Sequence, residues 1–183
     1  MCEEKVLNDI IALRREVISR FYSRMCEQIQ VSLGSDNPEE DEKTFDYIEA
    51  TLHALFDLYE KIEDLYGGKT NGKTNGKTKL EKVISNVLLV GHMKGLRFAC
   101  NKLKHSSKMG RATIIIRKHR YPMMFPTNYS KSFLWGDLSH CYDASRKTDV
   151  SDYPCYQKYI QGVEIRCAFK CAIDMLDKEL DIL

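Results

Sequence analysis

Hydrophobic residues recur at intervals of three and four along the first third of the chain, with charged residues between them. This spacing places the apolar side chains on one face of an α-helix. It predicts a first helix over residues 3–33 and a second over 40–66, joined by a short polar turn at 34–38, so we expect an antiparallel helical hairpin. The apolar positions are Val6, Ile10, Leu13, Val17, Phe21, Met25 and Ile29 in the first helix and Phe45, Ile48, Leu52, Leu55, Phe56, Tyr59 and Ile62 in the second.

The composition changes after the second helix. Residues 67–78 repeat Gly, Lys, Thr and Asn, and these short polar side chains cannot bury enough apolar surface to fix the backbone. We therefore expect a flexible loop there. The apolar period returns over about 80–105 and predicts a third helix, in which Gly91 and Gly95 would let another helix approach closely.

Beyond Lys108 the pattern becomes that of strands. The β-branched run at 113–116 and the segment 132–135 predict two short strands, and the proline-containing stretch 121–126 predicts an edge strand or extended segment. Residues 139–154 predict a loop, and 156–180 a last helix. The expected fold is mainly α: a bundle of about four helices, with a small β-hairpin or meander before the C-terminal helix, in one domain over 1–183.

Overall charge adds little to this picture. The chain has 28 Lys and Arg against 26 Asp and Glu, a net charge of +2, which is too small to indicate binding to nucleic acid or membrane. No apolar run approaches the ~20 residues that span a bilayer. The seven cysteines are odd in number and include no C-x-x-C pair, so we expect a cytoplasmic protein with reduced thiols and no bound metal.

The loop also contains a formal phosphate-binding pattern. Gly67, Gly72, Lys73 and Thr74 satisfy G-x-x-x-x-G-K-T. In nucleotide-binding proteins this pattern follows a strand and opens a helix, so that backbone N–H groups converge on phosphates. Here it arises from a tandem repeat after a long amphipathic helix. We therefore expect a linker and no nucleotide cofactor.

The third helix carries the candidate site. Arg97, Asn101 and His105 are spaced four residues apart and line up along one helix face. An Arg can hold a phosphate in a fork, and a His can transfer protons near neutral pH, so the trio suits a phosphodiester. The alternative is a solvated helix face, with His105 favourably placed near the helix C-terminus.

The stretch from Gly95 to His105 resembles the signature helix of the HEPN superfamily of small helical-bundle proteins. The family motif is an Arg followed, after four to six residues, by a His, with a polar residue directly after the Arg. The extended segment 121–126, the Trp-containing segment 133–138 and Gly162 near the start of a C-terminal helix are also similar to such proteins. In active members the resemblance implies metal-independent RNA cleavage, in a cleft formed where two signature helices meet across a homodimer axis.

The sequence departs from that motif at one position. Cys100 stands where the motif Arg would fall, whereas Asn101 and His105 match; Arg97 lies one helical turn too early. A thiol cannot neutralise a phosphorane as a guanidinium does. The leading hypothesis is an RNA-directed, HEPN-like protein, either a metal-independent endoribonuclease or its inactive relative. The alternative hypothesis is a noncatalytic helical module that binds a protein partner.

Aromatic and basic residues alternate in the segment that follows. Such interleaving can grip single-stranded nucleic acid by stacking, or it can belong to a packed hairpin with a solvated outer face. The aromatic residues are Tyr121, Phe125, Tyr129, Phe133 and Trp135, and the basic ones are Arg117, Lys118, His119, Arg120 and Lys131.

Overall fold

The computed structural model describes residues 8, 10–14, 16–67, 87–105, 114–119 and 130–180, a few of them, including Lys104 and His105, by backbone alone. This part of the chain is mainly α with one small sheet, as predicted, but it contains five α-helices and not four. In chain order the elements are the π-helical segment η1 (Val17–Tyr22), helices α2 (Ser23–Leu33), α3 (Pro38–Gly67) and α5 (Val87–His105), strands β1 (Ile114–His119) and β2 (Ser130–Trp135), the 3-10 turn η3 (Ser139–Cys141), and helices α6 (Lys147–Tyr159) and α7 (Ile165–Leu180).

The N-terminal helical hairpin forms as predicted. Helix α2 continues directly from η1 and packs against α3. Met25 and Ile29 of α2 and Ile48 of α3 are fully buried, which confirms the apolar stripes. Helix α3 begins at Pro38, where the missing N–H has no intrahelical partner to lose, and the Asn37 side chain accepts a hydrogen bond from the N–H of Glu39. Because α3 runs to Gly67, a helix and not a strand precedes the Gly-Lys-Thr repeat.

The predicted β-hairpin is also present. Strands β1 and β2 are antiparallel, with Ile114 opposite Trp135 and Ile116 opposite Phe133. Phe133 meets Phe45 of α3 edge-on, and Trp135 packs against Phe169 of α7. One face of the sheet therefore closes the helical core. The proposed loop at 68–78, the start of the third helix at 80–86 and the extended stretch 121–126 lie outside the described residues.

A buried lysine of this sheet binds to the helical hairpin through hydrogen bonds and an ion pair. Lys131 of β2 is only 3% exposed at its side chain. Its ammonium donates to the backbone carbonyls of Ser32 and Ser35 and lies 3.3 Å from the carboxylate of Asp41. Ser32 also donates to Asp41. The lysine thus satisfies carbonyls that the end of α2 leaves without a helical partner.

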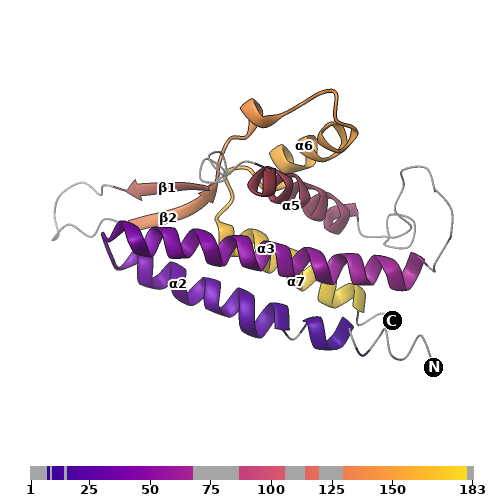
Figure 1. The fold of residues 1–183 in the computed structure, drawn as a ribbon, viewed down its shortest axis with the longest axis horizontal. Helices are drawn as coiled ribbons and strands as arrows, with labels where there is room; N and C mark the ends of the chain where they lie inside the picture. Colours follow the sequence, from indigo (N-terminus) through magenta and orange to yellow (C-terminus); the bar gives the residue numbers. More distant parts are fainter. Residues whose placement is uncertain are drawn as a thin grey trace.

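The prediction for the last third of the chain is wrong in two respects. Residues 139–154, expected as a loop, contain η3 and the first half of α6. The single helix expected over 156–180 is divided into α6 and α7. Figure 1 shows the consequence: α5 lies over α3, and α6 lies on the outer side of α5, away from the N-terminal hairpin.

The break between α6 and α7 has a local cause. Gly162 adopts φ +77°, a left-handed conformation that glycine takes without steric cost. Its N–H donates to the carbonyl of Trp135 at 2.8 Å, and the N–H of Trp135 donates to the carbonyl of Val163 at 3.1 Å. The chain therefore leaves the helix to pair with β2 before α7 begins. Within α6, Pro154 lies inside the helix despite its missing N–H.

No helix in the described part of the chain is both long and apolar enough to cross a membrane.

Candidate functional site

Helices α5 and α6 approach each other closely at two glycines of α5. A Cβ added to Gly91 would lie 2.5 Å from the ring of Tyr159, and one added to Gly95 would lie 2.7 Å from Ile160 and 3.1 Å from the Cα of Tyr156. Only glycine allows this separation. The close approach that Gly91 and Gly95 predicted is therefore present, and α6 is the helix that uses it.

Arg97, the first of the three predicted site residues, points at α6. Its Nε donates to Oδ2 of Asp152 at 2.7 Å, and its Nη2 donates to Oδ1 of the same carboxylate at 2.8 Å. The Asp152 side chain is 1% exposed, whereas the Arg97 side chain is 31% exposed. This fork-to-fork pair fixes the plane of the guanidinium. It also neutralises most of the charge that Arg97 would offer to a phosphate.

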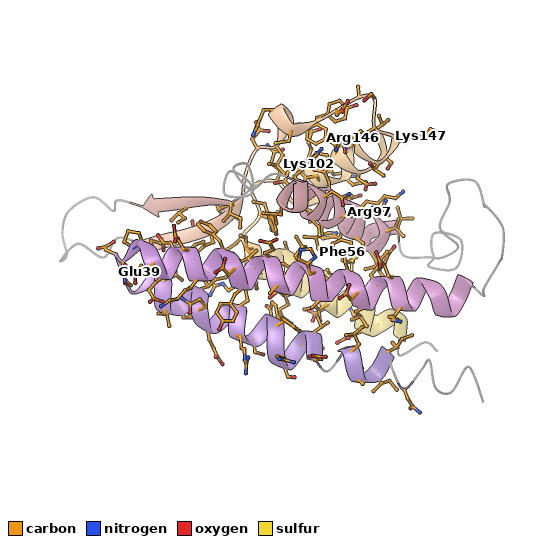
Figure 2. All side chains as sticks on the ribbon, in the orientation of Figure 1. Glu39, Phe56, Arg97, Lys102, Arg146 and Lys147 are labelled. Carbon is orange, nitrogen blue, oxygen red and sulfur yellow. The ribbon has the colours of Figure 1, made fainter. Side chains whose placement is uncertain are left out.

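A second ion pair joins the same two helices. Lys102 of α5 donates to Oδ2 of Asp149 at 2.5 Å, and both side chains are at most 10% exposed. The same carboxylate oxygen accepts the backbone N–H of Asp143, and the Lys102 ammonium lies 4.8 Å from the ring centroid of Phe98. Arg97 and Lys102 thus bind two carboxylates one turn apart on α6. Both cations are labelled on α5 in Figure 2.

The structure describes the side chains of the motif positions 100 and 101 but only the backbone of position 105. Cys100, at the position of the motif Arg, is 3% exposed and belongs to the hydrophobic core. Asn101 is half-buried on the turn after Arg97. His105 is the last residue of α5, and its side chain lies outside the described residues. The structure therefore brings Arg97 together with Asp152, and the predicted meeting of Arg97, Asn101 and His105 stays a prediction.

Two cysteines near the contact between α5 and α6, which we call the seam, have raised pKa values. Burial raises the pKa of Cys155, and Asp152 adds to the rise, whereas the neighbouring cations Lys94, Lys158 and Arg97 oppose it. Burial likewise raises the pKa of Cys141, opposed by Lys102. Because burial dominates in both cases, these thiols stay protonated at neutral pH and are poor nucleophiles.

The aromatic residues of the basic segment divide into two groups. Phe133 and Trp135 are at most 1% exposed, so they belong to a packed hairpin and cannot stack on a base. Lys131, two residues before Phe133 on β2, is also buried. Tyr121, Phe125, Tyr129 and Arg120 lie outside the described residues. Arg117, Lys118 and His119 belong to β1, where Lys118 is opposite Lys131.

Sequence reasoning missed the two carboxylates of α6, Asp149 and Asp152, because it treated residues 139–154 as a loop. The distribution of charge along the sequence could have indicated that the cations of α5 pair with carboxylates from another element. Between residues 82 and 136 the chain has 11 of its 28 Lys and Arg but none of its 26 Asp and Glu. This segment therefore has a formal charge of +11, whereas the rest of the chain has −9. Cations placed in the core by such a segment must find carboxylates elsewhere, and Asp149 and Asp152 lie in the next α-helix along the chain.

Among the described residues, no group of three or more His, Cys, Asp and Glu side chains is arranged to hold a metal ion. Comparisons of the chain with family models, with curated proteins and with solved structures find no significant match.

Proposed function

We propose that this chain is an HEPN-like protein that binds RNA without cleaving it. The observation that carries the proposal is the concentration of positive charge in residues 82–136, which include all of α5 and both strands. A basic block in a chain of nearly neutral net charge is typical of a surface that binds a polyanion.

Three cations of this segment pair with carboxylates that lie outside it. Asp152, Asp149 and Asp41 each pair with one cation of the segment, namely Arg97, Lys102 and Lys131. Displacement of counterions from a nucleic-acid backbone by cations is the main source of sequence-independent affinity.

Two features argue against cleavage. The motif Arg is replaced by Cys100, whose position in the core would force an introduced arginine to bury its charge. The nearest guanidinium, that of Arg97, is held by Asp152. Stabilising the charge that develops on phosphorus requires a donor aimed at the phosphate, and an arginine already paired with a buried carboxylate is poorly suited to it.

The test is a binding and cleavage assay on one single-stranded RNA carrying a fluorophore, with EDTA present. We expect anisotropy to report binding that weakens as salt is raised, with a slope of about 0.7 per phosphate contacted, and the RNA to stay intact. Cleavage that His105→Ala abolishes would instead identify a metal-independent ribonuclease. Absence of binding at low salt would reject the RNA proposal and favour the protein-interaction module.

A further inference from the structure

An exposed tyrosine forms the outer end of a row of three aromatic rings. Tyr142 directly follows η3 and is 39% exposed, whereas Tyr153 of α6 is buried. The two rings are stacked, with centroids 4.9 Å apart and an angle of 30° between their planes. On the inner side, the ring of Phe98 on α5 lies 5.1 Å from that of Tyr153. Because Tyr153 covers one face of the Tyr142 ring, the exposed part of this side chain is its other face and its edge.

Hydrogen bonds hold the backbone on both sides of this tyrosine. The N–H of Tyr142 donates to the carbonyl of Ser139 at 3.3 Å, and the N–H of Asp143 donates to the carboxylate of Asp149 at 3.0 Å. The same carboxylate binds the buried ammonium of Lys102. The ring is therefore held in place before any ligand arrives, which lowers the entropy cost of binding a flat group on it.

Two exposed cations follow the tyrosine along the chain. Arg146 and Lys147 stand at the start of α6, and Figure 2 shows both beside that helix, on the side away from α3. The Arg146 guanidinium lies 3.4 Å from the carboxylate of Asp143, so it is close to the residue next to Tyr142. Both side chains of that pair are about half exposed, and water screens their attraction. Lys147 has no ion pair among the described residues.

We propose that Tyr142 stacks on an unpaired base of single-stranded RNA, with Arg146 and Lys147 beside the adjoining phosphates. The proposal rests on the RNA-binding function proposed above. It adds a contact to a base, which the charge of residues 82–136 does not supply. Every base has a flat face that can stack on an aromatic side chain. Asp149 acts as a positioning residue, because it holds the segment that carries Tyr142.

The test compares Tyr142→Ala with the control Tyr47→Ala. Tyr47 of α3 is 37% exposed, nearly as much as Tyr142, but no ring of the described residues is stacked on it. We expect Tyr142→Ala to weaken binding of a labelled single-stranded RNA about five- to hundredfold, the range for loss of one stacked base. The salt slope should stay the same, because no phosphate contact is lost. Tyr142→Phe and Tyr47→Ala should both match the unaltered protein.

A second ligand distinguishes stacking from a general disturbance of the segment around Tyr142. A strand of the same length in which every nucleotide is abasic keeps the phosphates but has no base to stack. We expect the unaltered protein and Tyr142→Ala to bind this strand equally, and both more weakly than the unaltered protein binds RNA. Weaker binding of the abasic strand by Tyr142→Ala would contradict stacking, since the variant would then have disturbed the contacts to phosphate.

The outcomes also separate the two proposals. If the unaltered protein binds RNA and Tyr142→Ala binds it equally well, the stacking proposal is wrong and the RNA-binding function stands. If the unaltered protein does not bind RNA at low salt, both are rejected. A loss as large in Tyr142→Phe as in Tyr142→Ala would likewise overturn stacking, because phenylalanine keeps the ring and lacks only the hydroxyl.

Discussion

The outer face of α3 and the inner face of α5 use charge in opposite ways. Six acidic residues on α3 recur at helical spacing and are exposed: Glu39, Glu42, Asp46, Glu49, Asp57 and Glu60. On α5, Arg97 and Lys102 point into the interface with α6 and bind carboxylates there. Glu39 lies at the start of the α3 stripe and Arg97 near the α6 interface in Figure 2.

This difference separates charge that keeps a surface in water from charge that holds two helices together. An exposed ion pair contributes little, because water and salt screen it. A buried pair is different, since removing one partner leaves the other charged group without water and without a counterion. The four predictions that follow substitute residues in the α5–α6 interface and on the exposed face of α3, in order of the expected effect.

The largest effect is expected for Asp149→Ala. The substitution leaves the buried ammonium of Lys102 without its carboxylate and removes an acceptor of the Asp143 N–H. Loss of one partner of a buried pair costs about 3–5 kcal/mol. Urea denaturation should show a fall of that size in the free energy of unfolding. A loss below about 1 kcal/mol would mean that Lys102 reaches water.

A second variant distinguishes the charge from the packing. In Asp149→Ala with Lys102→Met, no unpaired charge is left in the interface. We expect the double variant to recover much of the stability, because apolar replacements of buried pairs are often neutral. If the double variant is less stable than Asp149→Ala alone, the hydrogen bond from Asp143 and the fit of the side chains matter more than the ion pair.

The same burial of charge explains what the sequence could and could not predict. The hairpin of α2 and α3 was predictable, because its apolar stripes run with a clear helical period. Helix α6 was not, because the face that it buries carries Asp149 and Asp152 beside Tyr153 and Tyr156, and Pro154 suggested a loop. Polar residues on a buried face hide the amphipathic pattern.

The candidate site was predictable only in part, for a related reason. Helical spacing correctly placed Arg97 and Asn101 on successive turns of one helix. It could not show that Arg97 binds Asp152, since the two residues are 55 positions apart and meet only through the glycine contacts of α5 with α6.

The second prediction concerns Gly95→Ala. The added Cβ would lie 2.7 Å from Ile160 and 3.1–3.2 Å from the backbone of α6. Forcing the helices apart should cost about 1–3 kcal/mol, more than alanine gains in helix propensity. The control is Gly34→Ala, where the nearest atoms are 3.7 Å away and φ is −88°. Thermal unfolding should show a lower Tm for Gly95→Ala alone, and equal Tm values would contradict the close packing.

The third prediction is that Asp152→Asn changes both the stability of the α5–α6 interface and the affinity for RNA. The amide keeps the shape of the carboxylate but removes its charge, so Arg97 loses the negative group that pairs with it. We expect about 1 kcal/mol of lost stability, since the Arg97 side chain is 31% exposed and its pairing is partly screened. RNA affinity should rise by about two- to fivefold if the charge acts on a bound phosphate. A fall in affinity would show that the orientation imposed by the carboxylate matters more than its charge.

The smallest effect is expected on α3, for Asp46→Asn combined with Asp57→Asn. Both residues are exposed on the acidic stripe, and substitutions on such a surface change stability by less than about 0.5 kcal/mol. Helix α5 packs against α3 (Figure 1), but both aspartates are exposed to solvent, and salt screens exposed charges with a Debye length of about 8 Å at physiological ionic strength. Urea denaturation and RNA anisotropy at 150 mM salt should therefore match those of the unaltered protein, while lowering the salt should make the double variant bind RNA slightly better. A loss of stability above about 1 kcal/mol would show that the stripe also holds structure, and a large change in RNA affinity at physiological salt would show that RNA lies along α3 as well.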